Sequence, residues 1–153
     1  MIKLIVPRME ELSFRKELLS DEDTMSYNHK WGGTIDFQEN KWEEWYRKWI
    51  INKNNDRYYA YLFSEKLNCY VGEIAYHYSE KEYIANIIIH SKYRGNGFGK
   101  IGLKLLCKKA KENGLVTLFD NIALGNPSIK MFLDYDFKEV WRNEEAIMIK
   151  KDL

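Results

Sequence analysis

The stretch from Ile84 to Gly102 reads IANIIIHSKYRGNGFGKIG, and it decides how the rest of the chain is interpreted. Its first six residues are rich in β-branched isoleucine, which suits a pleated strand. Apolar residues at adjacent positions indicate that both faces of this strand are covered. After His90, three glycines alternate with other residues, and apolar side chains then recur at helical spacing. The stretch therefore predicts a buried strand, a glycine-rich loop and a helix.

A glycine-rich loop that leads into a helix is suited to an anion. The first N–H groups of the helix have no carbonyl partner within it, and the helix dipole adds partial positive charge. Such ends commonly bind phosphate. Arg94, directly before the glycines, adds a planar fork of donors. We therefore expect a phosphate group at this loop.

Two common phosphate-binding patterns do not fit this stretch. The P-loop pattern G-x-x-x-x-G-K-[ST] is one residue too long for it, and Ile101 stands where a hydroxyl is needed. The dinucleotide fingerprint G-x-G-x-x-G is matched by Gly97, Gly99 and Gly102. That fingerprint should start where the strand ends, yet residues 90–96 intervene, and no later βαβ repeat follows.

A third pattern, [QR]-x-x-G-x-[GA], fits RGNGFG at residues 94–99 at every fixed position. On these residues the sequence resembles the GNAT superfamily of acetyl-CoA-dependent N-acetyltransferases. The resemblance is strongest from Asn86 to Leu106 and continues to Phe137. The segment IALGNPSIKMFLDYDF at residues 122–137 echoes the N-x-x-S-I-x-L-Y-x-x-x-G-F segment of many members, with an Asn-to-Ser spacing one residue shorter.

The resemblance implies a single α/β domain over residues 1–153. Its central sheet would be mixed, mostly antiparallel and splayed, with about seven strands and helices on both faces. The expected order is strand, two or three helices, three strands, helix, strand, helix and two strands. The sheet should diverge between the strands at 84–89 and 116–120. Main-chain groups would hold most of acetyl-CoA, and no metal is implied. The expected cofactor-binding residues are Ile87, Ile88, Ile89, Arg94, Gly95, Asn96, Gly97, Phe98, Gly99, Lys100, Asn126, Ser128 and Phe132.

The catalytic residues are harder to assign. An alkylammonium group has a pKa near about 10, so a general base must remove its proton before it attacks a thioester. Glu73 is the leading candidate because its apolar neighbours in VGEIA could raise its pKa, although a solvent-facing strand position explains it equally well. His77, His90 and Asp120 are weaker choices. In many members a Tyr hydroxyl protonates the departing thiolate; Phe132 stands there instead and is expected to pack against the cofactor.

Tyr135 is the remaining candidate for that acid role, because it lies close to Phe132 in the sequence. The acetyl acceptor is expected to meet a glycine-containing loop in the N-terminal half. Aromatic and acidic groups recognise cations well, and an ordered surface loop is the alternative explanation. The residues of this loop assigned to the acceptor are Tyr27, His29, Trp31 and Asp36.

The same N-terminal half contains two further patterns. Ser20 is predicted to cap a short helix that ends near Tyr27. Residues 38–51 place aromatic side chains at helical spacing, which favours packing in the core. Trp42, Trp45 and Trp49 carry this stripe.

Composition sets the outer limits of function. The chain has 24 basic and 23 acidic side chains, and this balance argues against a nucleic-acid-binding protein. It shows no signal peptide and no apolar run of membrane length, so we expect a cytoplasmic protein. The expected partners are acetyl-CoA and a small amine, with a homodimer compatible with the sequence. The rival functions are protein or peptide N-acetylation and CoA sensing without catalysis.

Overall fold

The structure, a computed structural model, describes residues 1–52 and 54–153, and for residues 29–31 it describes the backbone alone. In the described chain, seven strands form one mixed sheet in the order β1-β2-β3-β4-β5-β7-β6. Only the β4–β5 pairing is parallel there, which confirms the predicted fold class. The strands are β1 (Ile2–Ile5), β2 (Arg57–Ser64), β3 (Cys69–Ser79), β4 (Glu82–Ile89), β5 (Thr117–Ala123), β6 (Lys138–Arg142) and β7 (Ala146–Asp152).

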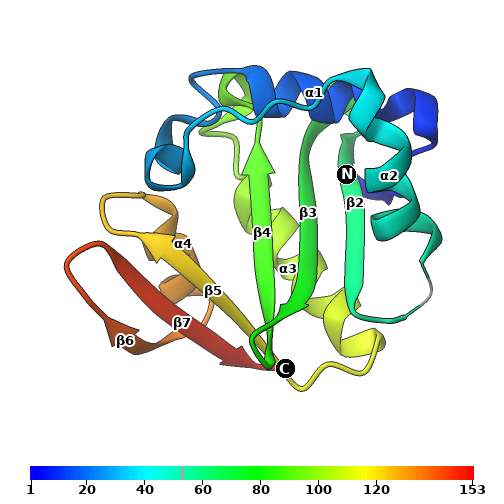
Figure 1. The fold of residues 1–153 in the computed structure, drawn as a ribbon. Coiled ribbons are helices and arrows are strands. Elements are labelled where there is room, and N and C mark those ends of the chain that lie inside the picture. The colour runs from blue at the N-terminus through cyan, green and yellow to red at the C-terminus, as the bar shows by residue number, and fades with distance from the viewer. Residues whose placement is uncertain (53) are drawn as a thin grey trace.

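Helices cover both faces of this sheet (Figure 1). The α-helices are α1 (Ser13–Ser20), α2 (Trp42–Tyr46), α3 (Phe98–Glu112) and α4 (Ser128–Asp134). Short 3₁₀ helices lie at Met9–Leu12, Ser26–Trp31, Glu39–Lys41 and Ser91–Tyr93, and a π turn at Arg47–Ile51 extends α2. No helix in the described ranges is long and apolar enough to cross a bilayer.

The largest core lies between the sheet and the helices α3 and α4. Leu103 and Leu106 of α3 are almost completely buried against strand residues such as Ile74. A Cβ atom at Gly102 would lie 3.0 Å from the Leu62 Cδ1 atom. Gly102 therefore allows α3 to pack closely on the sheet, which explains the third glycine of the rejected dinucleotide pattern.

The strands β4 and β5 share only one residue pair in the described ladder, Ile84 with Phe119. Beyond that pair the two strands diverge and leave an opening in the sheet (Figure 1). Successive residues on the open side are Ala85 to Ile89 of β4 and Asp120 to Ala123 of β5. The divergence lies where the sequence predicted it.

The N-terminal segment that follows α1 differs from the prediction. The cap is Asp21 rather than Ser20: its Oδ2 accepts a hydrogen bond from the Thr24 N–H at 2.9 Å. The chain then forms a turn and a kinked 3₁₀ helix instead of an α-helix. Ser91 holds this segment, because its N–H donates to Thr24 Oγ1 and its hydroxyl donates to Asp21 Oδ2, both at 2.9 Å. The short polar side chains favour this local network over a second α-helix.

The aromatic stripe at residues 38–51 packs against the sheet, as predicted. Trp45 stands edge-on to Tyr59 of β2 with the ring centroids 4.7 Å apart, and it stacks on Trp49 at 5.9 Å. Arg15 of α1 lies over the same Trp45 ring at 4.6 Å. These contacts fix α1 and α2 on β2.

Candidate active site

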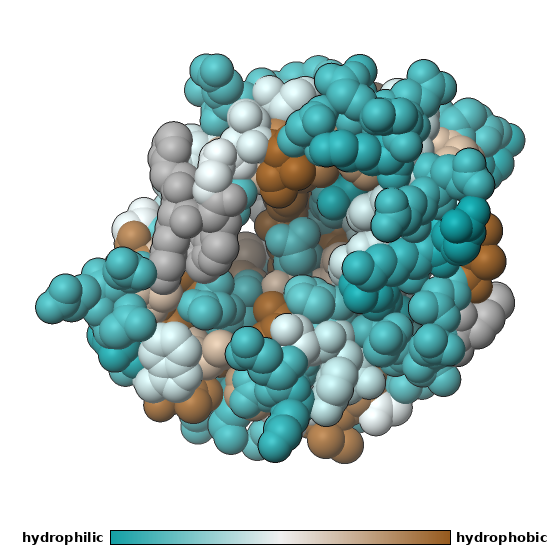
Figure 2. Space-filling view, viewed as in Figure 1, coloured by the Kyte–Doolittle hydropathy of each residue, from teal (hydrophilic) through white to brown (hydrophobic). Residues whose placement is uncertain are grey.

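A cavity of about 880 Å³ follows the opening between β4 and β5. Its wall combines the N-terminal segment, the β3–β4 hairpin, β4, the glycine-rich loop, β5 and the start of α4. The space-filling view shows the hollow, in which hydrophobic and hydrophilic side chains lie side by side (Figure 2). One continuous space therefore joins the glycine-rich loop to the middle of the sheet.

Four residues of the glycine-rich loop line this cavity: Gly95, Gly97, Phe98 and Gly99. Gly95 and Gly97 have φ angles of +82° and +81°, a region that L side chains rarely adopt. The first backbone bond of α3 runs from the Ile101 N–H to the Gly97 carbonyl at 3.2 Å. Within the described chain, the N–H groups of residues 95–100 have no protein acceptor. The loop therefore fits the diphosphate of a coenzyme A molecule.

The Arg94 guanidinium, expected to bind a phosphate, contacts the N-terminal segment instead. It donates to the Asp23 and Thr24 carbonyl oxygens at 3.2 and 2.6 Å, and it lies over the Tyr27 ring at 5.4 Å. The expected free fork of donors is therefore already engaged with the N-terminal segment. Arg94 still lines the cavity, and it holds that segment beside the glycine-rich loop.

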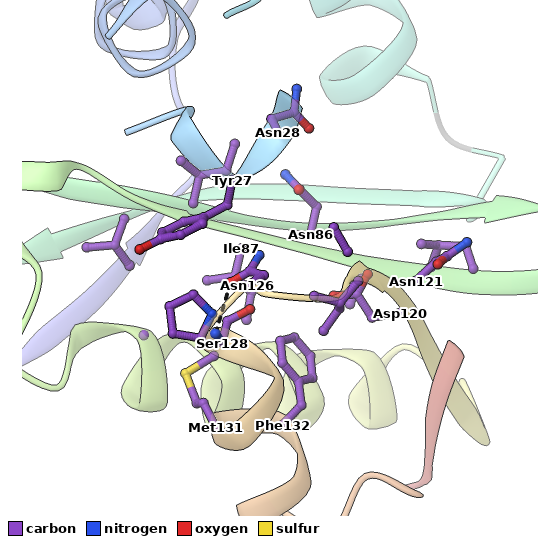
Figure 3. Close-up of a pocket in the computed structure, with 18 of the residues that line it drawn as sticks. Tyr27, Asn28, Asn86, Ile87, Asp120, Asn121, Asn126, Ser128, Met131 and Phe132 are labelled. Carbon is purple, nitrogen blue, oxygen red and sulfur yellow. Dashed lines mark hydrogen bonds between the residues drawn. The ribbon is translucent and has the colours of Figure 1, made fainter. Parts of the chain in front are cut away.

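The segment at the start of α4 forms the opposite wall. The Asn126 Oδ1 atom accepts a hydrogen bond from the Ser128 N–H at 2.9 Å, directly before α4 (Figure 3). Phe132 lines the cavity, and its ring packs edge-on against Phe137 at 5.0 Å. Of the residues expected to bind the cofactor, all line the cavity except Asn96 and Lys100. The Asn96 side chain instead donates to the Tyr93 and Arg94 carbonyl oxygens, and Lys100 is exposed on α3.

Glu73 does not reach the cavity wall. It is fully buried, and both of its carboxylate oxygens accept hydrogen bonds from Arg15 Nη1, at 2.7 and 2.8 Å. Burial raises the pKa of the Glu73 carboxyl, and the Arg15 guanidinium offsets part of that shift. The contact joins α1 to β3, so the geometry gives Glu73 a structural partner. Its role as general base stays a prediction.

Tyr135, the predicted acid, also lies away from the cavity wall. Burial raises the pKa of its hydroxyl, and the Lys151 Nζ atom lies 4.8 Å from the ring centroid. Tyr135 thus lies where the end of α4 contacts β7. The structure therefore brings neither predicted catalytic residue to the opening.

The residues assigned to the acceptor separate in the structure. Tyr27 lines the cavity above β4 (Figure 3). Asp36 is exposed and pairs with Lys41 at 3.0 Å, away from the cavity wall. The side chains of His29 and Trp31 lie outside the described residues. Tyr27 is the member of this set that the structure places at the cavity.

Sequence reasoning gave too little weight to the polar residues that line the opening itself. Asp120 of β5 lies on the cavity wall, and burial raises the pKa of its carboxyl to about 7. Asn121, the next residue, lines the same cavity, and its Oδ1 atom is buried without a partner. A signal was present, because both residues follow the point where the strands were predicted to diverge. Further polar or aromatic lining residues missed from the sequence are Trp49, Glu80, Glu82 and Asn86.

Comparison with known structures supports the same architecture. A spermidine N-acetyltransferase from Vibrio cholerae, solved with CoA and spermine, has a TM-score of 0.78 at 18% identity, covering 99% of this chain and 95% of that one. A phosphinothricin acetyltransferase from Sinorhizobium meliloti, solved with AcCoA, has a TM-score of 0.77 at 14% identity, with coverage of 99% and 88%. A ribosomal-protein-alanine N-acetyltransferase from Brucella melitensis has a TM-score of 0.73 at 19% identity, with coverage of 100% and 99%.

These identities are low, so the likeness shows the fold alone. The names of the three proteins also differ in the molecule that receives the acetyl group. Among curated proteins, none matches this sequence. The sequence model of the acetyltransferase (GNAT) family, however, matches residues 16–137, which is most of the chain. This chain belongs to the acetyltransferase (GNAT) family.

Proposed function

We propose that the chain transfers an acetyl group from acetyl-CoA directly to the primary amine of a small molecule. The observation that supports this most strongly is the continuity of the cavity, which joins the glycine-rich loop to the opening between β4 and β5. A diphosphate bound at the loop and a thioester at the opening would occupy two ends of one space. Acetyl-CoA supplies the activated acetyl group, and the protein's residues bind it, orient it and move protons.

The protein holds the coenzyme mainly with its backbone. The N–H groups of residues 95–100 face an anion without losing a protein partner. Beyond the Ile84–Phe119 pair, β4 has no strand partner on its β5 side among the described residues. That edge offers N–H and C=O groups to an extended amide-containing arm, as a neighbouring strand would. The arm would then run along Ile87 to Ile89 toward Asp120.

The acceptor half of the cavity favours a positively charged amine. Glu80 and Glu82 line it, and neither has a charged partner among the described residues. Trp49 lies in the same wall, but the Arg57 guanidinium already lies over its ring at 4.8 Å, so the attraction for an amine comes from the two carboxylates. Burial and the charges of Arg57 and Lys48 lower the pKa of His77, so this lining imidazole is neutral at pH 7.

The substrate's charge would therefore be balanced by carboxylates. Among the described lining residues Arg94 is the only Lys or Arg, and its guanidinium is occupied by two carbonyl oxygens. An ammonium group would enter beside the hairpin and approach the opening from the side opposite the glycine-rich loop. This arrangement supports a direct transfer, in which both substrates are bound together.

Thiol release from acetyl-CoA, measured over a panel of amines and peptides, tests this proposal. We expect turnover with cationic amines, and Glu80→Gln with Glu82→Gln should raise their KM without changing the KM of acetyl-CoA. Glu112→Gln, an exposed position outside the cavity lining, is the matched control. Turnover only with peptides would overturn the acceptor assignment. Tight acetyl-CoA binding without turnover on any acceptor would favour a CoA sensor over an enzyme.

A further inference from the structure

Asp120 has a distinctive position in the sheet. It follows Phe119, the last β5 residue that pairs with β4, so it is the first residue of β5 at the apex of the opening. On its other side it pairs with Ile149 of β7. A coenzyme arm that follows the open edge of β4 from the glycine-rich loop would reach this apex last. The carboxyl group therefore lies where the thioester would be.

The direction of the side chain agrees with this position. Successive residues of a strand point to opposite faces, so Asp120 shares a face with Leu118 and Ile122. Both belong to the core cluster that contains Phe132. Figure 3 shows Asp120 close to Phe132, with Asn121 directed away from it. The carboxyl thus faces the α4 side of the opening, and Asn121 faces the acceptor side.

The surroundings of Asp120 leave its carboxyl free to exchange a proton. Its neighbours from α4 and β7 are Phe132 and Ile149, which carry no charge, and on β4 Ile84 pairs with the preceding residue, Phe119. Within the described chain it has no ion pair, and the donor that affects it is the backbone N–H of Asn121. It is partly accessible from the cavity. A purely structural carboxylate would be expected to have a fixed polar partner.

We infer that Asp120 is the catalytic residue that passes a proton from the incoming amine to the departing sulfur. This inference rests on the proposed function. Because the attacking nitrogen and the sulfur bond to the same carbon, one carboxyl group can reach both atoms. Phe132, which lies beside it, has no group that could supply the proton.

The proton transfers balance without another reactant. The Asp120 carboxylate first takes a proton from the bound ammonium, and the neutral amine forms a bond to the thioester carbon. The C–S bond then breaks with its electron pair on sulfur, and the Asp120 carboxyl gives that proton to the sulfur. The second proton of the attacking nitrogen returns to the carboxylate and leaves to water with the products. The outcome is an amide, a thiol and one released proton.

The ionisation of Asp120 supports this role. Burial raises the pKa of the carboxyl to about 7, and a group that must both accept and donate a proton works best near the operating pH. The cycle begins with the carboxylate form. We therefore expect kcat to rise with pH through about 7 and then to level off while the amine is still protonated.

Steady-state kinetics of the full chain with the best amine from the panel test this inference. In Asp120→Asn, kcat should fall by about 10²- to 10⁴-fold, and the rise near pH 7 should disappear. The KM of acetyl-CoA should stay close to the wild-type value. Asp136→Asn, a change at a highly exposed carboxylate, is the matched control and should keep the wild-type profile.

Several outcomes would overturn the inference. Asp120→Asn with wild-type kcat and pH profile would remove Asp120 from the chemistry. If that variant did not fold, the wild type alone would still decide, because a kcat independent of pH between about 6 and 8.5 contradicts the inference. Both results leave the proposed function intact. A wild-type protein that releases no thiol with any amine would instead refute the proposed function itself.

Discussion

Replacing Glu73 with glutamine separates the structural from the catalytic interpretation of this residue. The carboxylate is fully buried and accepts hydrogen bonds from Arg15 Nη1 at 2.7 and 2.8 Å. The guanidinium also lies within 4.6 to 5.4 Å of the ring centroids of Phe37, Trp45 and Tyr59. The glutamine side chain would keep the shape and one acceptor oxygen. It would leave a cation buried among aromatic rings without its counter-charge.

The size of the effect follows from this burial. Removing one partner of a buried pair costs about 3–5 kcal/mol, because the other charge stays desolvated. The acceptor kept by glutamine and the aromatic faces below Arg15 favour the lower end, about 3 kcal/mol. For a chain of this size each kcal/mol lowers Tm by about 2–4 °C. We therefore expect Tm to fall by about 6–12 °C.

Thermal and urea unfolding measure the loss of stability, and kcat is measured well below the variant's Tm. Glu43→Gln is the control, because its pair with Arg47 is exposed and should contribute less than about 1 kcal/mol. The structural interpretation predicts that kcat per folded molecule changes little. An unchanged Tm together with a kcat lowered by about 10²-fold or more would refute this reasoning and restore Glu73 as the base.

Three further changes test other parts of the account. Asp120→Asn should be more stable than the wild type at pH 8 by about 1–4 kcal/mol and similar to it at pH 4. The reason is that the pKa of the Asp120 carboxyl is raised to about 7, so wild-type stability is lost as pH rises from about 4 through 7. Equal urea midpoints at pH 8 would contradict this. Hydrogen bonds from Thr24 and Ser91 lower the pKa of Asp21 to about 2. Wild-type stability should therefore fall by about 1 kcal/mol, after solvent screening, between about pH 4 and pH 2. The variant Asp21→Asn should remove that pH dependence. Gly97→Ala should lower the free energy of unfolding by about 1–2 kcal/mol, because position 97 has a φ of +81°, and it should also raise the KM of acetyl-CoA. Gly114→Ala, at a φ of +91° beyond the end of α3, should lower the stability alone.

Local patterns predicted the elements of this fold well. The run of β-branched residues located β4, and the apolar residues at helical spacing located α3. These elements depend on neighbours in the sequence, so a single sequence carries the information for them. The divergence beyond Ile84 and Phe119 was expected from the family resemblance.

The contacts that the sequence did not reveal join distant parts of the chain. Arg15 lies 58 residues before Glu73, and nothing near Glu73 in the sequence reveals the cation that pairs with it. Arg94 likewise looked free for a phosphate, but carbonyl oxygens about 70 residues earlier occupy its guanidinium.

Asp120 and Asn121 show a second limit of sequence reasoning. The alternation of a strand tells that neighbouring side chains face opposite ways, but it does not tell which face opens on the cavity. Here the opening gives both residues access to it from different sides. The position of Asp120 at the apex of the opening is visible only in three dimensions.

The central claim is that the backbone N–H groups of residues 95–100 bind the diphosphate of coenzyme A. A titration followed by ¹H–¹⁵N correlation spectroscopy tests it directly, with the resonances of Gly95, Gly97 and Gly99 as reporters. We predict that coenzyme A shifts these amide protons downfield, as hydrogen bonds to an anion do, and that pantetheine, which lacks the diphosphate, leaves them in place. Binding of coenzyme A at the cavity without any shift of these three resonances would contradict the account.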